Sequence, residues 1–371
     1  MSTAHTIKIP AHNSIYTPNY EQNNYKKREL TAYYSLPDAG VRPDTGVVLF
    51  IAGFGGHANS NVYKKMRAQF ADTYNLVTIQ CDYFGWEFMQ GNDSTVLSAE
   101  LVDTLLQRLS LAEVQALAND KPRFYAYLQK EDLQLTLECV MNESLDNFCD
   151  MSYMQAIDNI TAVLHVIQGL ADEGLHVNAQ KIMLFGQSQG AYLSYFCHAL
   201  TRNLFTHILD NSTWLYPSYI HNYRVFITDE GEKRFRYITT KIPFNQEYLH
   251  LSNLTRGYTS PCRILAYHGS TDNFHPFAEK QTVLGGGGSI DLRLITEADV
   301  PTEIFKDTSH GLGADFLALF GSFHKDFVGE TAVNPSIKLY KRPHVRTPGI
   351  DIDYKSGVPV VTAFRGLSMN T

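Results

Sequence analysis

The chain has 371 residues, of which 44% are hydrophobic and 19% are charged, and its formal net charge is -7 at pH 7. This composition is typical of a globular protein with a sizeable core and excludes disorder over the whole chain. The acidic balance works against non-specific binding to nucleic acid or to an anionic membrane surface. We therefore expect no nucleic-acid partner.

The N-terminal segment MSTAHTIKIPAHNSIYTPNY has no basic start followed by an apolar stretch, so it does not predict a secretory signal. No apolar run reaches the roughly 18 residues that a membrane span needs. The five cysteines are an odd number, and none forms the C-x-x-C pair typical of zinc or redox sites. These features predict a cytoplasmic protein with reduced thiols and no membrane span.

Buried strands and amphipathic helices alternate along the chain. Continuous apolar runs, typical of parallel strands covered on both faces, occupy residues 46–53, 75–82, 181–186, 205–210 and 262–269. Helical periodicity occupies residues 61–74, 154–174, 190–203 and 313–327. This alternation predicts an α/β fold with a doubly wound, mostly parallel sheet.

Two long stretches interrupt this alternation. Residues 91–150 carry polar helical pieces, and residues 211–260 are rich in Tyr, Asn, Arg and Thr. Both exceed an ordinary connection, and insertions at the carboxyl ends of strands surround the ligand crevice of open α/β sheets. We therefore predict one domain over residues 1–371, with cap insertions at 91–150 and 211–260 and a C-terminal extension at 330–371.

A serine lies between two glycines where the apolar run at 181–186 meets the following helix. The sequence GQSQG fits G-x-S-x-G, the strand-to-helix elbow that raises a serine hydroxyl above the edge of a sheet. The tight turn needs both glycines, because side chains there would strike the neighbouring strand and helix. The alternative, a serine that only caps the helix, explains Ser188 but not both glycines.

An alcohol becomes a good nucleophile only when a base can take its proton, and that base needs an orienting carboxylate. In this type of fold the order along the chain is Ser, then Asp or Glu, then His. Asp272 follows a buried strand, and His310 lies in a glycine-flanked loop before a helix. We predict that Ser188 is the nucleophile, His310 the base and Asp272 its orienting group. Three nearby residues compete for the latter two roles: Asp307, His268 and His275.

These motifs resemble the α/β-hydrolase superfamily of serine esterases, lipases and peptidases. The resemblance rests on GQSQG (186–190), HGSTD (268–272) and SHG (309–311), and it covers about residues 45–327. It implies backbone donors for an oxyanion at Gln189 and at Phe54 or Gly55 of the AGFGGH loop, of which we favour Phe54. That loop departs from the His-Gly-Gly-Gly form of the family. No metal or organic cofactor is implied.

The same glycine loop supports a second hypothesis. The sequence GFGGHA follows a strand and matches G-x-G-x-x-A, and Asp82 ends the next strand, as in a binding site for NAD. The spacing to the acid exceeds the usual roughly 20 residues. An NAD-dependent oxidoreductase leaves the elbow, Asp272 and His310 unexplained, so the sequence favours a hydrolase. Acyl transfer, thioester or peptide hydrolysis by the same triad, and a non-catalytic binding protein on the same fold, remain alternatives.

Aromatic and polar residues follow two of the predicted strands. They include Tyr83, Phe84 and Trp86 after one strand, and Trp214, Tyr216 and Tyr219 after another. Such a mixture suits a polar ligand such as a sugar ester better than a lipid. The alternative is that these aromatic residues pack in the hydrophobic core beneath the insertions. The predicted substrate-binding residues are Gly55, Tyr83, Trp86, Trp214 and Tyr216.

The extent of the chain and its two insertions also resemble a bacterial α/β-hydrolase family associated with flagellin-glycosylation genes. That resemblance implies an O-acyl esterase acting on an acidic nine-carbon (nonulosonic) sugar or its glycan. Such a substrate carries a carboxylate, so an arginine is expected in the pocket. Arg234, Arg236 and Arg256 lie in the second insertion, where solvated surface arginines are the more usual case. The acyl group, the alcohol and the oligomeric state are left open.

Overall fold

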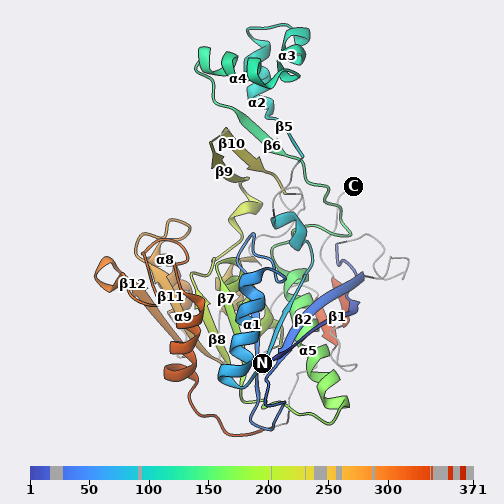
Figure 1. Cartoon of the computed structure of the whole chain (residues 1–371), viewed down its shortest axis with the longest axis vertical. Helices are drawn as coiled ribbons and strands as arrows, with labels where there is room; N and C mark the ends of the chain where they lie inside the picture. Colours follow the sequence, from blue (N-terminus) through green and yellow to red (C-terminus); the bar gives the residue numbers. More distant parts are fainter. Residues whose placement is uncertain are drawn as a thin grey trace. The chain divides into compact units, whose positions relative to one another are not determined.

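The computed structural model describes residues 1–16, 28–90, 94–201, 203–229, 231–237, 249–255, 261–285, 289–334 and 336, and the backbone alone of 350–353 and 360–364. The chain divides into two compact units (Figure 1). The first unit comprises residues 1–89, 145–217 and 243–371, and the second comprises residues 90–144 and 218–242.

The first unit is built on an eight-stranded sheet with the order β1-β2-β4-β3-β7-β8-β11-β12. Its strands are β1 (Thr3–Ala11), β2 (Arg28–Leu36), β3 (Gly46–Ile51), β4 (Leu76–Cys81), β7 (Ile182–Gln187), β8 (His207–Asn211), β11 (Arg263–Gly269) and β12 (Ile290–Ile295). The β1–β2 and β2–β4 pairs are antiparallel, whereas all neighbouring pairs from β4 to β12 are parallel. This arrangement confirms the predicted mostly parallel sheet and is that of the α/β-hydrolase fold.

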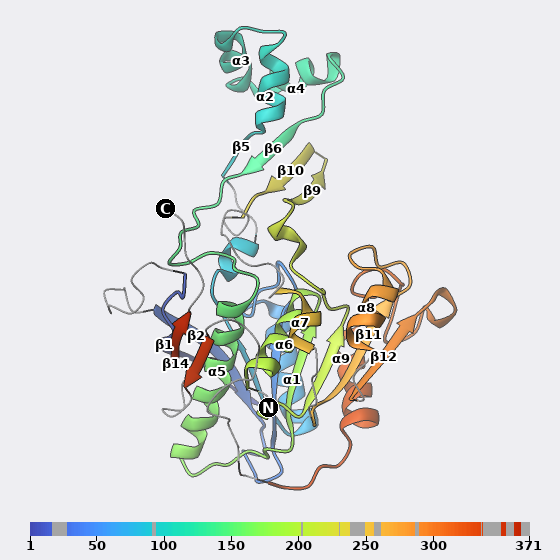
Figure 2. The same cartoon turned by 180° about the vertical axis from the view of Figure 1, so that it is seen from behind.

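Helices cover both faces of this sheet (Figures 1 and 2). They are α1 (Asn61–Tyr74), α5 (Tyr153–Asp172), α6 (Gln189–Thr201), α7 (Leu251–Thr255), α8 (Phe277–Leu284) and α9 (Phe316–Phe323), which runs into a π-helical turn at His324–Val328. The α1 and α9 helices share one face, where the rings of Phe70 and Phe320 stack with their centroids 4.4 Å apart. The α5 and α6 helices pack together on the opposite face.

The central strands β3 and β4 are buried on both faces of the sheet. Every residue of β3 and β4 is buried, because helices lie on both sides of the sheet. Phe50 of β3 belongs to the core cluster that also contains Phe70 and Phe320. Such strands have no solvent-exposed face, so even the polar Thr78 and Gln80 of β4 are buried, as expected for parallel strands in a doubly wound fold.

The second unit combines segments from both predicted insertions. Its four-stranded sheet has the order β5-β6-β10-β9, with β5 (Thr95–Leu97), β6 (Thr136–Cys139), β9 (Arg224–Thr228) and β10 (Gly231–Phe235). Strand β10 of the second insertion pairs in parallel with β6 of the first. Three helices, α2 (Ala99–Leu106), α3 (Leu111–Ala118) and α4 (Lys121–Lys130), enclose a small core of their own. Their predicted role as a cap stays a prediction.

Some elements differ from the sequence-based expectations. Strands β1, β2 and β12 were not anticipated, because they lie towards the sheet edges and carry part-exposed, polar residues. The helix expected from residue 313 begins at Phe316, after a turn in which Gly311 and Gly313 have positive φ. Strands β13 (Ile350–Asp353) and β14 (Val360–Phe364) pair antiparallel, while most of the predicted C-terminal extension lies outside the described residues.

Two further expectations concern cysteines and membrane spans. All five cysteines are buried thiols. Among the described residues, no helix is both long and apolar enough to cross a membrane.

Candidate active site

Ser188 lies at a sharp turn between the end of β7 and the first residue of α6. Its φ is 55°, in the left-handed region that residues other than glycine rarely adopt. The backbone N–H of Ser188 donates to the carbonyl oxygen of Asn211, at the end of the adjacent β8, at 2.8 Å. Backbone strain of this kind concentrates at functional sites, where the surrounding structure enforces it.

The two glycines that flank this turn are required by close backbone approaches. A Cβ atom at Gly190 would lie 1.9 Å from the carbonyl oxygen of Ile51 on β3. A Cβ atom at Gly186 would lie 2.4 Å from the backbone of Gly190 and Ala191. Both distances are impossible for real side chains, so the steric reason inferred from the sequence is confirmed.

Ser188, His310 and Asp272 form one hydrogen-bonded row. The Nε2 atom of His310 lies 2.7 Å from the Oγ atom of Ser188, and the Nδ1 atom lies 2.8 Å from the Oδ2 atom of Asp272. The imidazole is 18% exposed, whereas the carboxylate of Asp272 is only 2% exposed. The structure thus brings together the three side chains that the sequence order singled out.

The environment of Asp272 favours its ionised form. Burial is the largest influence and raises the pKa, but the hydrogen bond and charge of His310 and the backbone N–H of Phe274 together outweigh it. The pKa of Asp272 therefore lies below its ordinary value. An ionised carboxylate that accepts a hydrogen bond from Nδ1 leaves Nε2 of His310 free to accept the proton of the serine hydroxyl.

The loops that carry Asp272 and His310 are fastened to each other. The backbone N–H of Thr271 donates to the carbonyl oxygen of Thr308 at 3.0 Å, and the hydroxyls of these two residues lie 2.9 Å apart. A Cβ atom at Gly269 would lie 2.1 Å from the same carbonyl oxygen. The close approach of the two loops fixes the distance between the carboxylate and the imidazole.

The His310 loop is also fastened to the end of β8. The backbone N–H of Gly311 donates to the hydroxyl of Ser212 at 3.1 Å, and the side-chain amide of Asn211 donates to the carbonyl oxygen of Gly311 at 3.1 Å. Asn211 is also the residue that accepts the backbone N–H of Ser188. The serine and the histidine are thus held by one common strand end.

The competing residues occupy other positions. The carboxylate of Asp307 accepts hydrogen bonds from the backbone N–H and the hydroxyl of Ser309, so it stabilises its own loop. The Nδ1 atom of His268 lies 3.8 Å from Asp272, and burial lowers the pKa of His268 to about 4. Burial likewise lowers the pKa of His275 to about 4. Both histidines are therefore neutral, buried neighbours of Asp272.

The glycine loop after β3 lies against the serine. A Cβ atom at Gly53 would lie 3.2 Å from the carbonyl oxygen of Gln187 and 3.5 Å from the Cβ atom of Ser188. Gly55 has a φ of 87°. The side chain of the buried Gln189 donates to the amide oxygen of Gln155 at 2.7 Å. The loop and the start of α6, which carry the predicted oxyanion donors, therefore adjoin the same serine.

The loop does not have the form of a dinucleotide-binding turn. In that motif the helix opens within the glycine pattern and presents its N-terminus to a pyrophosphate. Here α1 begins only at Asn61, and the side chain of Ser60 already accepts the N–H of Tyr63. The carboxylate of Asp82 accepts the hydroxyl of Tyr33 at 2.7 Å. These features do not favour NAD at the Gly53 loop.

An aromatic row reaches from the glycine loop to the histidine. The rings of Phe54 and Trp214 lie 5.8 Å apart, those of Trp214 and Phe274 lie 6.4 Å apart, and those of Phe274 and His310 lie 4.3 Å apart. Trp214 is only 1% exposed, whereas Phe274 is 36% exposed. Phe274 was missed from the sequence, although its place two residues after Asp272 could have indicated it.

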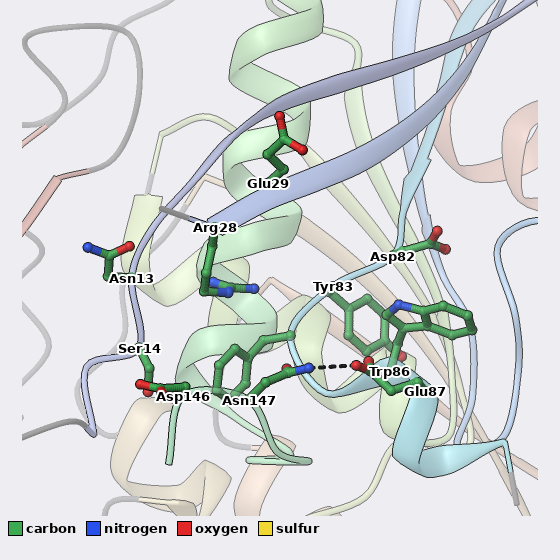
Figure 3. Close-up of a pocket in the computed structure, with 11 residues that line it drawn as sticks. Asn13, Ser14, Arg28, Glu29, Asp82, Tyr83, Trp86, Glu87, Asp146 and Asn147 are labelled. Carbon is green, nitrogen blue, oxygen red and sulfur yellow. Dashed lines mark hydrogen bonds between the residues drawn. The ribbon is translucent and has the colours of Figure 1, made fainter. Parts of the chain in front are cut away.

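The other predicted substrate-binding residues lie in two places. The ring of Tyr216 contacts that of His275, with centroids 4.9 Å apart, close to the Asp272 loop. Tyr83 and Trp86 line a pocket of about 760 Å³ (Figure 3). The described residues that line this pocket do not include the hydrogen-bonded row at Ser188.

Two of the arginines considered for binding an acidic sugar form ion pairs with glutamates of the second unit. Arg234 pairs with Glu232 and Glu100, and Arg236 pairs with Glu138 at 3.2 Å. Arg256 lies outside the described residues. Across the described part of the chain, no cluster of three or more His, Cys, Asp or Glu side chains could hold a metal ion.

The sequence model of one protein family, described as "Protein of unknown function (DUF2920)", matches residues 26–230. The chain belongs to this family. The match covers more than half of the 371 residues and includes the elbow, but it ends before Asp272 and His310. A search of curated proteins gave no match.

Solved structures with a similar fold include Est1E from Butyrivibrio proteoclasticus, which has been solved with bound ferulic acid. It is 12% identical, with a TM-score of 0.45, and the match covers 79% of this chain and 92% of that chain. Esterase 2 from Thermogutta terrifontis is 13% identical, with a TM-score of 0.43 and coverage of 87% and 96%. This likeness concerns the fold and says nothing of the reaction.

Proposed function

We propose that the protein is a serine hydrolase that cleaves a carboxylic ester through an acyl-enzyme. The observation that carries the proposal is the unbroken row from Ser188 through His310 to Asp272, with hydrogen-bond distances of 2.7 and 2.8 Å. Such a row is the working arrangement of a nucleophile, its base and the group that orients the base. The positive φ of Ser188 at a strand-to-helix turn gives further support.

In the first half of the reaction, the Oγ atom of Ser188 attacks the ester carbonyl carbon while Nε2 of His310 takes the hydroxyl proton. The resulting oxyanion accepts hydrogen bonds from the backbone N–H groups of Phe54 and Gln189. The tetrahedral intermediate collapses, the bond to the alcohol breaks, and His310 returns its proton to the leaving alcohol. Asp272 holds the ring and stabilises the imidazolium throughout.

In the second half, a water molecule gives a proton to His310 and attacks the acyl carbon. Collapse of the second tetrahedral intermediate releases the carboxylic acid and returns the proton to Ser188. Besides the ester and water, the steps use side chains and backbone groups of this chain. Acyl transfer would follow the same first half and differ only in the acceptor that replaces water.

For the substrate, we propose a polar ester such as an O-acylated sugar. Polar and aromatic residues occur together after the carboxyl ends of β4 and β8, which suits a hydroxyl-rich ligand better than a long lipid. The narrower idea of an acidic nine-carbon sugar rests only on the sequence resemblance. The pairing of Arg234 and Arg236 with glutamates gives it no support.

The test is labelling of the purified protein by a fluorophosphonate probe, with turnover of p-nitrophenyl acetate followed in parallel. We expect labelling and turnover in the natural protein and in the control Ser322→Ala, whose serine on α9 bonds only locally to Asp326. We expect neither in Ser188→Ala nor in His310→Ala. A folded natural protein that is neither labelled nor active would overturn the proposal.

A further inference from the structure

A pocket separate from the serine site lies at the same edge of the sheet. Asp82, Tyr83 and Phe84 follow the carboxyl end of β4, and Trp86 begins the short 3₁₀ helix Trp86–Met89. Because β4 runs parallel to β3 and β7, this edge is also the one at which Ser188 lies. The pocket volume of about 760 Å³ is in the range of small-molecule sites, roughly 300–1,000 Å³.

The turn at Gly85, between the lining residues Phe84 and Trp86, is tightly packed against the segment that carries Asn147. Gly85 has a φ of 66°, and a Cβ atom there would lie 2.0 Å from the carbonyl oxygen of Phe148. The backbone N–H of Gly85 donates to the side-chain oxygen of Asn147 at 2.9 Å, and the amide of Asn147 donates to Glu87 at 2.5 Å (Figure 3). Glu87 is thus held in place before any ligand arrives, which lowers the entropic cost of binding.

Acidic side chains outnumber basic ones among the described residues that line the pocket. Four of these residues carry carboxylates, Glu29, Asp82, Glu87 and Asp146, and one, Arg28, is a cation. The guanidinium of Arg28 is already paired with the buried Asp158 at 2.7 Å. The pocket therefore attracts cations and repels carboxylates, and its sign is opposite to that needed for an acidic sugar.

Two buried polar atoms of residues that line the pocket make no hydrogen bond, although one of them, Oδ1 of Asp82, lies 3.9 Å from Nε2 of His57. Within the described part of the chain, the hydroxyl of Tyr83 and the Oδ1 atom of Asp82 have no hydrogen-bond partner. Tyr83 is 5% exposed. Buried polar groups nearly always have a partner in the protein, in water or in a ligand, so these two atoms indicate unused hydrogen-bonding capacity.

An aromatic side chain completes the pocket. The indole of Trp86 stacks on the ring of His57, with a centroid distance of 4.6 Å and an interplanar angle of 16°, which holds its orientation. An indole beside carboxylates and amides combines a stacking surface for a sugar ring, an attraction for cations and acceptors for hydroxyl groups.

From this combination we infer that the pocket binds a hydroxyl-rich ligand with a protonated amine, of which a non-acetylated amino sugar is the simplest example. The carboxylates of Glu87 and Asp146 face the ammonium group, and Trp86 stacks on the ring. Binding at this pocket requires no reaction at Ser188. Failure of ligand binding and failure of ester hydrolysis would therefore be seen as separate results.

The chain contains two tryptophans, Trp86 in the pocket and the buried Trp214, so intrinsic fluorescence reports on the pocket. We would titrate glucosamine, glucose and glucuronate at neutral pH into the natural protein and into Trp86→Phe, with calorimetry alongside. Glucosamine should bind most tightly and glucuronate most weakly. The fluorescence change should be absent in Trp86→Phe.

The charge is tested with Glu87→Gln and Asp146→Asn, each of which keeps the shape of the side chain. Each should weaken glucosamine binding about two- to fivefold, as expected for a partly exposed charge pair, and leave glucose binding unchanged. The matched control Glu303→Gln removes an exposed charge that does not line the pocket. Equal or tighter binding of glucuronate, a fluorescence change that survives in Trp86→Phe, or no binding of glucosamine would overturn the inference.

Discussion

Lys280 of α8 and Asp210 of β8 form an ion pair in which neither side chain has any exposed surface, with 3.7 Å between Nζ and Oδ2. Lys280 also donates to the carbonyl oxygen of Tyr267 at 3.2 Å, and Asp210 accepts from the hydroxyl of Tyr195 at 3.0 Å. The pair therefore fastens α8, which follows the loop of Asp272, to the strand beside the elbow.

The first prediction concerns this ion pair. Lys280→Met leaves the buried carboxylate of Asp210 without its counter-charge, which should lower the free energy of unfolding by about 3–5 kcal/mol. The double variant Lys280→Met with Asp210→Asn removes both charges and should recover part of that loss. Urea denaturation of the three proteins measures both effects, and a loss below about 1 kcal/mol in the single variant would contradict the prediction.

The second prediction concerns the orienting carboxylate. Asp272→Asn keeps the shape but lets the imidazole adopt the wrong tautomer, so kcat for an activated ester should fall by about 10³–10⁴. Asp307→Asn is the matched control, because that carboxylate bonds only to Ser309 in its own loop. Similar losses in both variants, with both folded by circular dichroism, would show that Asp272 has no special role.

The third prediction concerns the elbow glycine. Gly190→Ala places a Cβ atom where the carbonyl oxygen of Ile51 lies, so the variant should unfold at a markedly lower temperature or fail to fold. Gly169→Ala on α5 is the control, since nothing lies within 4 Å of its added Cβ atom. That control should gain about 0.5–1 kcal/mol, because alanine is favoured inside helices. Thermal melts of the two variants should move in opposite directions.

The fourth prediction concerns the pH dependence of stability. Burial, followed by the charge of Arg263, lowers the pKa of His207 to about 4 from its ordinary 6.5. Between these values the unfolded chain binds a proton that the folded chain does not. The free energy of unfolding should therefore fall as the pH falls from 6.5 towards 4, by up to about 1.4 kcal/mol per pH unit for this histidine.

The measurement for His207 is the slope of unfolding free energy against pH in the natural protein and in His207→Gln. Burial raises the pKa of Asp150 to about 6, so protonation of Asp150 stabilises the folded protein and opposes the histidine slope. The difference between the two proteins removes this common contribution. Equal slopes would show that His207 titrates in the same way in the folded and unfolded chains.

Several features of the fold could be predicted from local sequence alone. The runs at β3, β4, β7, β8 and β11 are rich in apolar residues because nearly every residue of those strands is buried. Helix α1 begins and ends at the predicted residues. Strands β1, β2 and β12 could not be predicted in the same way. They are stabilised by pairing with neighbouring strands, and their part-exposed residues leave no continuous apolar run.

The pairing of the two insertions was also beyond the local pattern. Strand β10 pairs with β6, about a hundred residues earlier in the sequence. No local pattern in either segment predicts which strand it pairs with. Only the folded chain shows that the insertions contribute to one sheet with its own core.

Some features of the candidate site could likewise be predicted from local sequence, and others depend on the tertiary structure. The sequence by itself determined the elbow, because only glycine tolerates the close approaches on either side of Ser188, and this requirement is local. It also determined the chain order of serine, acid and histidine. The tertiary structure decided that Asp272, and not Asp307, contacts His310, because parallel strands bring loops from distant parts of the chain to one edge of the sheet. It also decided the charge of the Trp86 pocket, which arises from strand ends and loops far apart in the sequence.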